Sequence, residues 1–341
     1  MAVLAIVTSS PPDVEGGHLV IARALVQAAR DAGHEARLIV TPDYGFGQQT
    51  RSYLANYRTD VRGYDQVISL RYPSYAVWHR RHVHWLTHTM REYYDQWPQF
   101  VRSISPANQL KERVRRALTH IADRHLLKQH VAKVCALSRT VRDRAAHDFG
   151  IDAEVVYPPP PQRPYRCDQY GDFIFAVSRL MPLKRLDMLV RALAEPRAGG
   201  IRAVIAGEGE CSGELKRLAD TLGVSTRVTF LGRIDDAAML DHLARCRAVC
   251  FTPHQEDYGF VTVEAFASRK AVVTCRDSGG PAEIVRDGET GFVCDASPHA
   301  LADALSRLMA DSALAERLGT NAAVRVAEMR WDAVVRRLVI V

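Results

Sequence analysis

Short apolar runs alternate with amphipathic helical segments along the whole chain, and this alternation limits the fold more than any other feature. The runs are rich in Val, Ile and Phe and have few polar interruptions, which is typical of parallel strands covered on both faces. The predicted strands are Val3–Thr8, Ala36–Val40, Gln66–Leu70, His84–Thr87, Lys133–Leu137, Glu154–Val156, Phe173–Val177, Arg202–Ala206, Arg227–Leu231, Ala248–Thr252, Ala271–Thr274 and Phe292–Cys294. The predicted helices are Leu19–Ala32, Leu186–Ala194, Gly213–Leu222, Ala237–Arg245, Val261–Ser268 and Ala300–Met309. Strand followed by helix predicts an α/β chain with doubly wound parallel sheets.

A run of prolines divides the chain. Tyr157 is followed by Pro158–Pro161, and four prolines remove four backbone donors and fix φ, so this stretch is neither helix nor central strand. A length of 341 residues suits two domains, each large enough to bury a core. We predict two Rossmann-like domains, over residues 1–163 and 164–341, facing each other across a cleft. Ligands of such sheets bind beyond the carboxyl ends of the strands, so function is expected in the loops that follow them.

Composition excludes several classes of protein. With 47% hydrophobic and 25% charged residues, the chain is globular rather than disordered, collagenous or coiled coil. No run reaches the roughly 18 to 20 apolar residues that a membrane-spanning helix needs. The apolar start, residues 1–8, lacks a basic flank and a cleavage site, and we interpret it as a strand rather than a signal peptide. Seven cysteines without C-x-x-C spacing indicate reduced thiols, so we predict a cytoplasmic protein.

The excess of positive over negative charge is confined to the first half of the chain. Residues 1–165 carry a net charge of +7 and residues 166–341 a net charge of −1. A basic face suggests an anionic partner: a phosphorylated substrate, an anionic membrane surface or nucleic acid. Solvated helix faces explain a run such as 111–116 (KERVRR) at least as well. Nucleic acid is the least favoured partner, because the chain lacks the interleaved aromatic and basic residues of a stacking platform.

The loop after the strand Phe173–Val177 is basic. It carries Arg179, Lys184 and Arg185, with no acid before Asp187. Arginine binds phosphate oxygens in pairs and lysine adds a point charge, so the loop could neutralise a diphosphate. A solvated basic loop explains it equally well.

Two glutamates flank a predicted helix start in the loop after Ala248–Thr252. Pro253 and Gly259 place Glu256 in the loop and Glu264 about one turn inside the helix. Both carboxylates could then face one ligand at the helix N-terminus, where free N–H groups suit phosphate and carboxylates suit sugar hydroxyls. Favourable helix capping explains Glu256 but is a weaker explanation for Glu264.

Glycines and a histidine complete the candidate residues. The pair Gly16 and Gly17 precedes the first helix and could hold an anion there. The segment 207–213 (GEGECSG) is one residue longer than G-x-G-x-x-G and carries two acids, which argues against a dinucleotide site. Two glycines in 278–283 (SGGPAE) allow close backbone approach, or simply a tight turn. His88 follows a predicted strand and could bind a sugar hydroxyl, although a structural histidine is the more common case.

Together these loops resemble the retaining, nucleotide-sugar-dependent glycosyltransferases of family 4, which have the GT-B fold. Glu256 and Glu264 match the E-x7-E motif of that family in EDYGFVTVE, and Arg179 and Lys184 match its basic pair in SRLMPLK. Gly16–Gly17 and the later GGPAE and DGETGFV segments match its glycine turns. The segment HTMREYYD is similar to H-T-P-M-R-Y of bacterial mannosyltransferases, but it is one residue shorter and has no proline before Met90.

The resemblance implies a role for each matching residue. Glu264 would hold the ribose hydroxyls of the nucleotide. Glu256, with the backbone of Gly259, Phe260 and Val261, would hold the donor sugar. Arg179 and Lys184 would stabilise the departing diphosphate, helped by the backbone at Gly16 and Gly17. The base would meet Arg233 and Ile234. On the acceptor side, His88 and Arg91 would meet the transferred sugar or the acceptor.

These roles predict transfer of a hexose from GDP-mannose or a UDP-hexose to a glycan, a lipid-linked acceptor or a small molecule. The predicted chemistry needs no metal or cofactor, because arginine, lysine and a helix terminus supply the charge, and D-x-D is absent from the sequence. The basic first domain also fits peripheral contact with the inner face of an anionic membrane. Alternatives are a nucleotide-sugar epimerase or phosphorylase on the same architecture, or a non-catalytic protein that binds sugar or nucleic acid.

Overall fold

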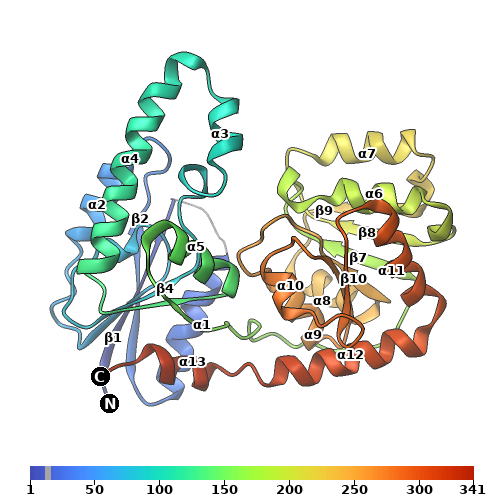
Figure 1. Ribbon diagram of the computed structural model, residues 1–341. Helices are drawn as coiled ribbons and strands as arrows, with labels where there is room; N and C mark the ends of the chain where they lie inside the picture. The colour runs from blue at the N-terminus through green and yellow to red at the C-terminus, as the bar shows by residue number, and fades with distance from the viewer. Residues whose placement is uncertain (12–16) are drawn as a thin grey trace. The chain divides into compact units, whose positions relative to one another are not determined.

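The computed structural model describes residues 1–11 and 17–341, which form two compact units (Figure 1). Unit 1 comprises Met1–Pro161 together with Arg330–Val341, and unit 2 comprises Gln162–Met329. Each unit has its own six-stranded sheet, and every strand pairing in both sheets is parallel. Two doubly wound units therefore confirm the predicted α/β class.

Unit 1 orders its strands β2-β1-β3-β4-β5-β6. The strands are β1 (Val3–Ser10), β2 (Glu35–Pro42), β3 (Gln66–Ser69), β4 (His82–Leu86), β5 (Lys133–Ala136) and β6 (Glu154–Val155). The helices are α1 (Gly17–Asp31), α2 (Gln49–Tyr57), α3 (Trp97–Ser103), α4 (Pro106–Gln129), α5 (Arg139–Phe149) and α13 (Trp331–Leu338), with 3₁₀ turns η1 (Ser74–Ala76) and η2 (Arg91–Tyr93). Strand order reverses at β1 and β3, which is where ligands of such sheets bind.

Unit 2 orders its strands β12-β11-β10-β7-β8-β9. The strands are β7 (Phe173–Val177), β8 (Arg202–Ala206), β9 (Val228–Gly232), β10 (Ala248–Cys250), β11 (Val272–Cys275) and β12 (Gly291–Cys294). The helices are α6 (Leu186–Ala194), α7 (Ser212–Thr221), α8 (Asp236–Arg245), α9 (Phe260–Ala267), α10 (Gly280–Ile284), α11 (Pro298–Ala310) and α12 (Ser312–Ala327), with 3₁₀ turns η3 (Pro182–Lys184), η4 (Pro196–Ala198) and η5 (Ser225–Arg227). Here the order reverses at β7 and β10, so the basic loop and the glutamate loop leave the sheet side by side.

The last twelve residues correct the predicted domain limits, because residues 330–341 belong to unit 1 rather than to the domain predicted over 164–341. Helix α13 buries Val334, Val335 and Leu338 and packs against α1. The Gln66 side-chain amide then fixes the end of the chain, because its Nε2 donates to the carbonyl of Leu338 at 2.7 Å and its Oε1 accepts from the backbone N–H of Ile340 at 2.9 Å. Apolar burial and these two hydrogen bonds hold this segment on the first sheet.

All twelve predicted strands are present, and each predicted helix lies within two residues of its expected limits. The prediction omitted α2, α3, α4, α5, α10, α12 and α13. In the described part of the chain, no helix combines the length and the apolar character needed to cross a membrane.

Candidate active site

Three loops of unit 2 meet at the carboxyl ends of β7, β10 and β11. Lys184, from the loop after β7, places its Nζ 2.6 Å from Oε2 of Glu256, from the loop after β10. Only 12% and 22% of these two side chains are exposed. The backbone joins the same loops, since the N–H of His254 donates to the carbonyl of Leu183 at 2.8 Å. The predicted diphosphate lysine and the first glutamate of the pair therefore lie together.

Arg185 joins the same loops through hydrogen bonds and an ion pair. Its guanidinium donates to the backbone carbonyls of Thr252 and Pro253 at 2.8 and 2.7 Å. It also forms a two-pronged ion pair with Asp277, at 2.8 and 2.7 Å, and this pair lowers the pKa of the Asp277 carboxyl. Arg185 is thus engaged in holding the loops, which leaves Lys184 as the cation beside Glu256.

The glycine pair after β11 lets the glutamate loop lie directly on the backbone. The N–H of Glu256 donates to Ser278, and the N–H of Gly280 donates to the carbonyl of Glu256, both at 2.9 Å. A Cβ added at Gly279 would lie 2.4 Å from the Glu256 carbonyl oxygen, and one at Gly280 would lie 2.6 Å from the carbonyl oxygen of Tyr258. The close approach predicted for these glycines is therefore an approach to the neighbouring loop of the same chain.

Glu264 lies one turn inside α9, as predicted, and the residue before the helix, Gly259, has a φ of +79° that favours glycine. The carboxylate is 7% exposed and accepts hydrogen bonds from Arg163 at 2.7 Å and from the Tyr165 hydroxyl at 3.4 Å. Burial raises the pKa of Glu264, and the Arg163 guanidinium opposes this shift. Arg163 also pairs with Asp236 at 3.0 Å. The two glutamates are therefore held by different cations.

The loop that carries Arg179 packs closely against a neighbouring segment that contains two glycines. Ser178 and Leu180 pair with the end of β8 and the segment after it, through bonds from their N–H groups to the carbonyls of Ala206 and Glu208 at 3.1 and 2.8 Å. A Cβ at Gly207 would lie 1.8 Å from the Ser178 carbonyl oxygen, and one at Gly209 would lie 2.3 Å from that of Leu180. The glycines that resembled a dinucleotide motif hold the Arg179 loop in place. The exposed Arg179 guanidinium has no hydrogen-bond or ion-pair partner among the described residues.

The remaining predicted donor residues lie on the loop after β9 and at the start of α9. Arg233 is exposed and Ile234 is half-buried, directly after β9. Phe260 and Val261 form the first turn of α9 and are half-buried. Gly17 is the first residue of α1, and Gly16 falls outside the described residues.

In unit 1, His88 belongs to a polar chain at the carboxyl ends of the strands. Arg71, which follows β3, donates from Nε to Nε2 of His88 at 3.2 Å. His88 Nδ1 lies 2.9 Å from the carbonyl of Thr89. Because an arginine N–H only donates, Nε2 is the acceptor and the His88 proton is on Nδ1. This arrangement corresponds to a neutral imidazole in one fixed tautomer.

The same arginine connects His88 to two more strands. Its Nη2 lies 3.0 Å from a carboxylate oxygen of Asp43, after β2, and its Nη1 donates to the carbonyl of Ser9, in β1, at 2.9 Å. The Arg71 and Asp43 side chains are 15% and 5% exposed. Arg91, the other predicted acceptor-side residue, forms an ion pair with Asp95 at 2.5 Å.

Sequence reasoning missed several residues of these clusters, among them Asp43, Arg71, Arg163 and Tyr165. Asp43 directly follows β2 and Arg71 lies two residues after the end of β3, so the strand-end rule that selected His88 applies to them equally. Arg163 and Tyr165 lie in the linker after the prolines and carry no comparable signal. In the described ranges, no group of three or more His, Cys, Asp or Glu side chains could hold a metal ion.

Comparison with known proteins defines the class to which this architecture belongs. HepE from Anabaena, solved with UDP and glucose, superimposes with a TM-score of 0.72 at 18% identity over 98% of both chains. The fold of two parallel-sheet units is the GT-B fold of glycosyltransferases, as the sequence predicts.

The match to a known family lies in unit 2. Residues 165–325 match the family described as "Glycosyl transferases group 1". A D-inositol 3-phosphate glycosyltransferase of Nocardia farcinica is 35% identical over 165 residues, covering 46% of this chain and 36% of the relative. A GDP-mannose-dependent alpha-(1-6)-phosphatidylinositol monomannoside mannosyltransferase of Mycolicibacterium smegmatis is 33% identical over 211 residues, covering 54% of this chain and 55% of the relative. The chain thus spans about a third to a half of the length of these two relatives.

Proposed function

We propose that this protein is a glycosyltransferase that moves a hexose from a nucleotide-diphosphate sugar to a hydroxyl group of an acceptor, with retention of configuration and without a metal. The observation that carries the proposal is the contact of Lys184 with Glu256 where strand order reverses in unit 2, beside the helix that carries Glu264. A cation next to a carboxylate provides one group for a diphosphate and one for sugar hydroxyls.

Each end of the donor has a matching group in unit 2. The buried Glu264 carboxylate would accept hydrogen bonds from the ribose hydroxyls, in exchange for part of its contact with Arg163. Arg179 and Lys184 would bind the diphosphate, and Glu256 with the first turn of α9 would bind the sugar. Arg233 and Ile234 would meet the base. Binding of the diphosphate would draw Lys184 away from Glu256 and leave that carboxylate for the sugar.

The reaction places positive charge on the sugar and negative charge on the leaving group. The bond from the anomeric carbon to the diphosphate oxygen breaks, and the acceptor oxygen forms the new bond on the same face. The acceptor proton leaves with the diphosphate. The cations bound to the diphosphate and the N-terminus of α9 would favour this transition state, because they contact the leaving group before charge develops on it.

Unit 1 would supply the acceptor side through His88, held by Arg71, and through Arg91. A neutral imidazole in a fixed tautomer can orient a sugar hydroxyl without adding charge. The acceptor would be a glycan, a lipid-linked molecule or a small molecule, and GDP-mannose and UDP-hexoses are the donors to test. The GDP-mannose dependence of one relative and the UDP bound to one structural neighbour support this choice. The net charge of +7 in residues 1–165 supports contact with an anionic membrane at the cytoplasmic face.

A screen of nucleotide sugars by thermal shift tests the proposal. A donor at 100 times its dissociation constant should stabilise the protein by about 2.7 kcal/mol. Glu264→Ala and Arg179→Ala should remove this response. Arg197→Ala should keep it, since Arg197 is 67% exposed and pairs with Asp303. No response from any nucleotide sugar would contradict the proposal.

Product analysis then separates the possible reactions. A transferase releases nucleoside diphosphate in an acceptor-dependent manner, whereas an epimerase releases none and a phosphorylase requires phosphate. The anomeric configuration of the product, read by NMR, tests retention. Activity that disappears in EDTA and returns with a divalent cation would contradict metal independence.

A further inference from the structure

Helix α4 has the reverse of the usual amphipathic arrangement. Its buried residues are Glu112, Thr119, Asp123 and Leu127, so the inner face is largely polar. Its outer face carries four large apolar side chains with exposures of 53% to 73%: Leu110, Val114, Leu118 and Ile121. Steps of four, four and three residues place these four on one stripe, which we call the α4 stripe. An ordinary surface helix turns such a stripe inward.

The inner face explains why the helix does not rotate. Asp123 is fully buried and accepts hydrogen bonds from the hydroxyls of Tyr53, Tyr75 and Tyr94. Glu112 accepts from the Tyr93 hydroxyl at 2.6 Å and pairs with Arg115 at 2.7 Å. Turning the α4 stripe inward would break these charged hydrogen bonds, which are worth about 1.5–3 kcal/mol each. These hydrogen bonds on the inner face therefore keep the α4 stripe on the outer face of the helix.

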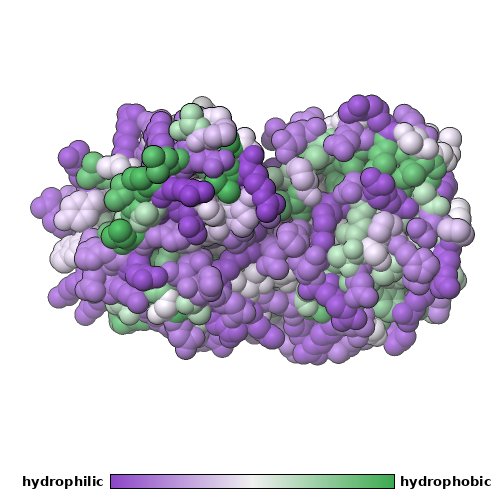
Figure 2. All heavy atoms as spheres, turned by 45° about the horizontal axis from the view of Figure 1, so that its top comes forward, coloured by the Kyte–Doolittle hydropathy of each residue, from purple (hydrophilic) through white to green (hydrophobic). Residues whose placement is uncertain are grey.

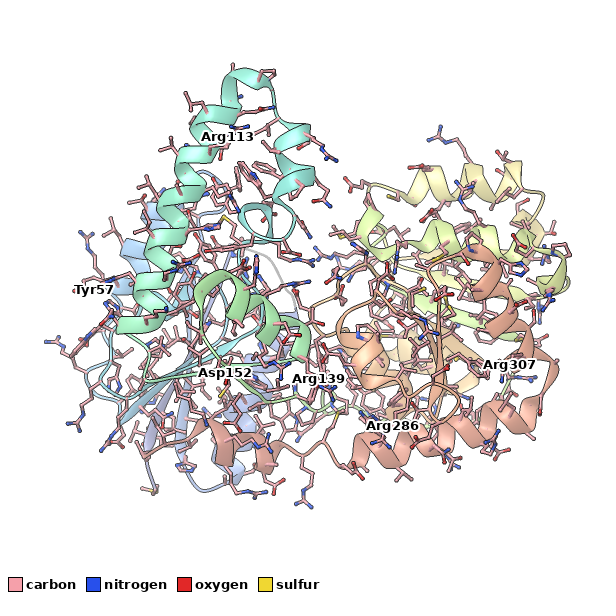
Figure 3. The ribbon with its side chains drawn as sticks, viewed as in Figure 1. Tyr57, Arg113, Arg139, Asp152, Arg286 and Arg307 are labelled. Carbon is pink, nitrogen blue, oxygen red and sulfur yellow. The ribbon has the colours of Figure 1, made fainter. Side chains whose placement is uncertain are left out.

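The charged residues of α4 are also divided between its inner and outer faces. Both acids of the helix, Glu112 and Asp123, point inward. The exposed residues around the α4 stripe include Lys111, Arg113, Arg124 and Lys128. Figure 3 marks Arg113 on the part of α4 that extends beyond the sheet, and Figure 2 shows hydrophobic residues gathered over this helix. The exposed face of α4 is thus apolar and cationic, without an acid.

We propose that α4 lies in the surface of an anionic lipid bilayer, with the α4 stripe among the upper acyl chains and the four cations at the phosphates. At 24 residues the helix is about 36 Å long, enough to lie flat on the surface over many headgroups. Long basic side chains can reach the phosphates while their stems stay beside apolar groups. A second copy of the chain fits less well, because two α4 faces would bring like charges together.

This inference rests on the membrane contact in the proposed function and names the surface that makes it. It does not depend on the donor or on catalysis, because binding to vesicles is measured without nucleotide sugar. Failure of the transferase assay would leave the vesicle result unaffected.

The test is sedimentation of the full chain with vesicles of phosphatidylcholine containing one third phosphatidylglycerol. We expect Leu118→Ser/Ile121→Ser to lower the partition coefficient at least tenfold. Arg113→Gln/Arg124→Gln should lower it about thirtyfold at low salt and less at high salt, since each cation near the surface is worth about 1 kcal/mol. Vesicles of pure phosphatidylcholine should bind the protein more weakly than the mixed vesicles.

Two control variants replace exposed apolar residues outside α4: Leu54→Ser on α2 and Val324→Ser on α12. The two side chains are 47% and 64% exposed. Both should bind as the unaltered chain does. Equal losses in the controls, or none in the α4 variants, would overturn the inference. It would also be overturned if sedimentation velocity without lipid showed a dimer that Leu118→Ser/Ile121→Ser dissolves. Thermal unfolding confirms that each variant is folded, as expected for exposed positions.

Discussion

The two units share a sheet topology but differ in what they bury. Unit 2 has a large apolar core on one face of its sheet, made mainly of Ala, Val, Leu and Ile side chains. Unit 1 buries titratable groups, among them Asp123, His82, His84 and the hydroxyls of Tyr75 and Tyr94. Burying a polar group is costly unless it is hydrogen-bonded, so we expect unit 1 to be the more sensitive to pH and to single substitutions. The groups proposed to bind the nucleotide lie on loops of unit 2, and unit 1 carries an interior network whose bonds orient a surface helix.

The largest expected effect lies in unit 2. Lys184→Ala removes the cation beside Glu256, and we expect kcat/KM to fall about a hundred- to a thousandfold, as when one preorganised group at a developing charge is lost. Steady-state kinetics with saturating acceptor measure this. Lys216→Ala on α7 is the matched control and should have unchanged kinetics. A loss in kcat/KM of less than fivefold for Lys184→Ala would show that Lys184 does not act in the reaction.

Unit 1 should respond most to loss of its buried carboxylate. Asp123→Ala leaves three tyrosine hydroxyls without their acceptor, and we expect the free energy of unfolding to fall by about 3 kcal/mol or more. Urea unfolding followed by circular dichroism gives this value. Asp60→Ala, at an exposed acid paired only with Arg62, should change it by less than about 0.5 kcal/mol. Equal effects of the two substitutions would contradict the account of α4.

The buried histidines predict a pH dependence. Both share the hydroxyl of Ser69, at 2.6 Å from His82 and 2.7 Å from His84. Burial lowers the pKa of His82 to about 3 and that of His84 well below its ordinary value. The unfolded chain therefore binds more protons, so stability should be fully present above about pH 6.5 and decline as pH falls toward 3. His82→Gln should flatten this decline, and an unchanged slope between pH 6 and 4 would contradict it.

The titration of Asp123 changes the free energy of unfolding in the direction opposite to that of the two histidines. Burial raises its pKa to about 6, against its hydrogen bonds from the tyrosines. In this case the folded chain binds more protons between about pH 4 and pH 6, so the Asp123 contribution to stability declines as pH rises through this window. Asp123→Asn should remove that contribution. Subtracting its unfolding profile from that of the unaltered chain should give a difference that falls with rising pH, and a flat difference would refute the assignment.

A smaller effect on activity is expected from Arg71, which donates a hydrogen bond to His88. Arg71→Gln removes the donor to His88 Nε2 and the ion pair with Asp43. We expect about a tenfold loss in kcat/KM, mostly in the KM for the acceptor, with the nucleotide affinity unchanged. Arg71→Lys cannot make both contacts and should recover only part of the activity. An equal loss in donor affinity would show that Arg71 acts on the fold of the site rather than through His88.

The same difference between the units explains what could be predicted from the sequence. Parallel strands buried on both faces are apolar runs, so every strand was identified, but β4 was predicted to begin at His84 because the two buried histidines disguise its start at His82. The spacing of the apolar residues in α4 is helical, but it would predict that they point inward, whereas the buried acids turn them outward. In unit 2 the strand-end rule led to Lys184, Glu256 and Glu264. It could not lead to Arg163, because that arginine comes from the linker.

The central claim is that unit 2 binds the nucleotide. It is tested most directly by calorimetric titration of the full chain with GDP and with UDP. Without a sugar, His88 has no part in binding. We predict that at least one nucleotide binds at one site per chain, that Glu264→Ala weakens it tenfold or more, and that His88→Ala leaves it unchanged. Absence of binding for both nucleotides, or equal weakening by the two substitutions, would contradict the claim.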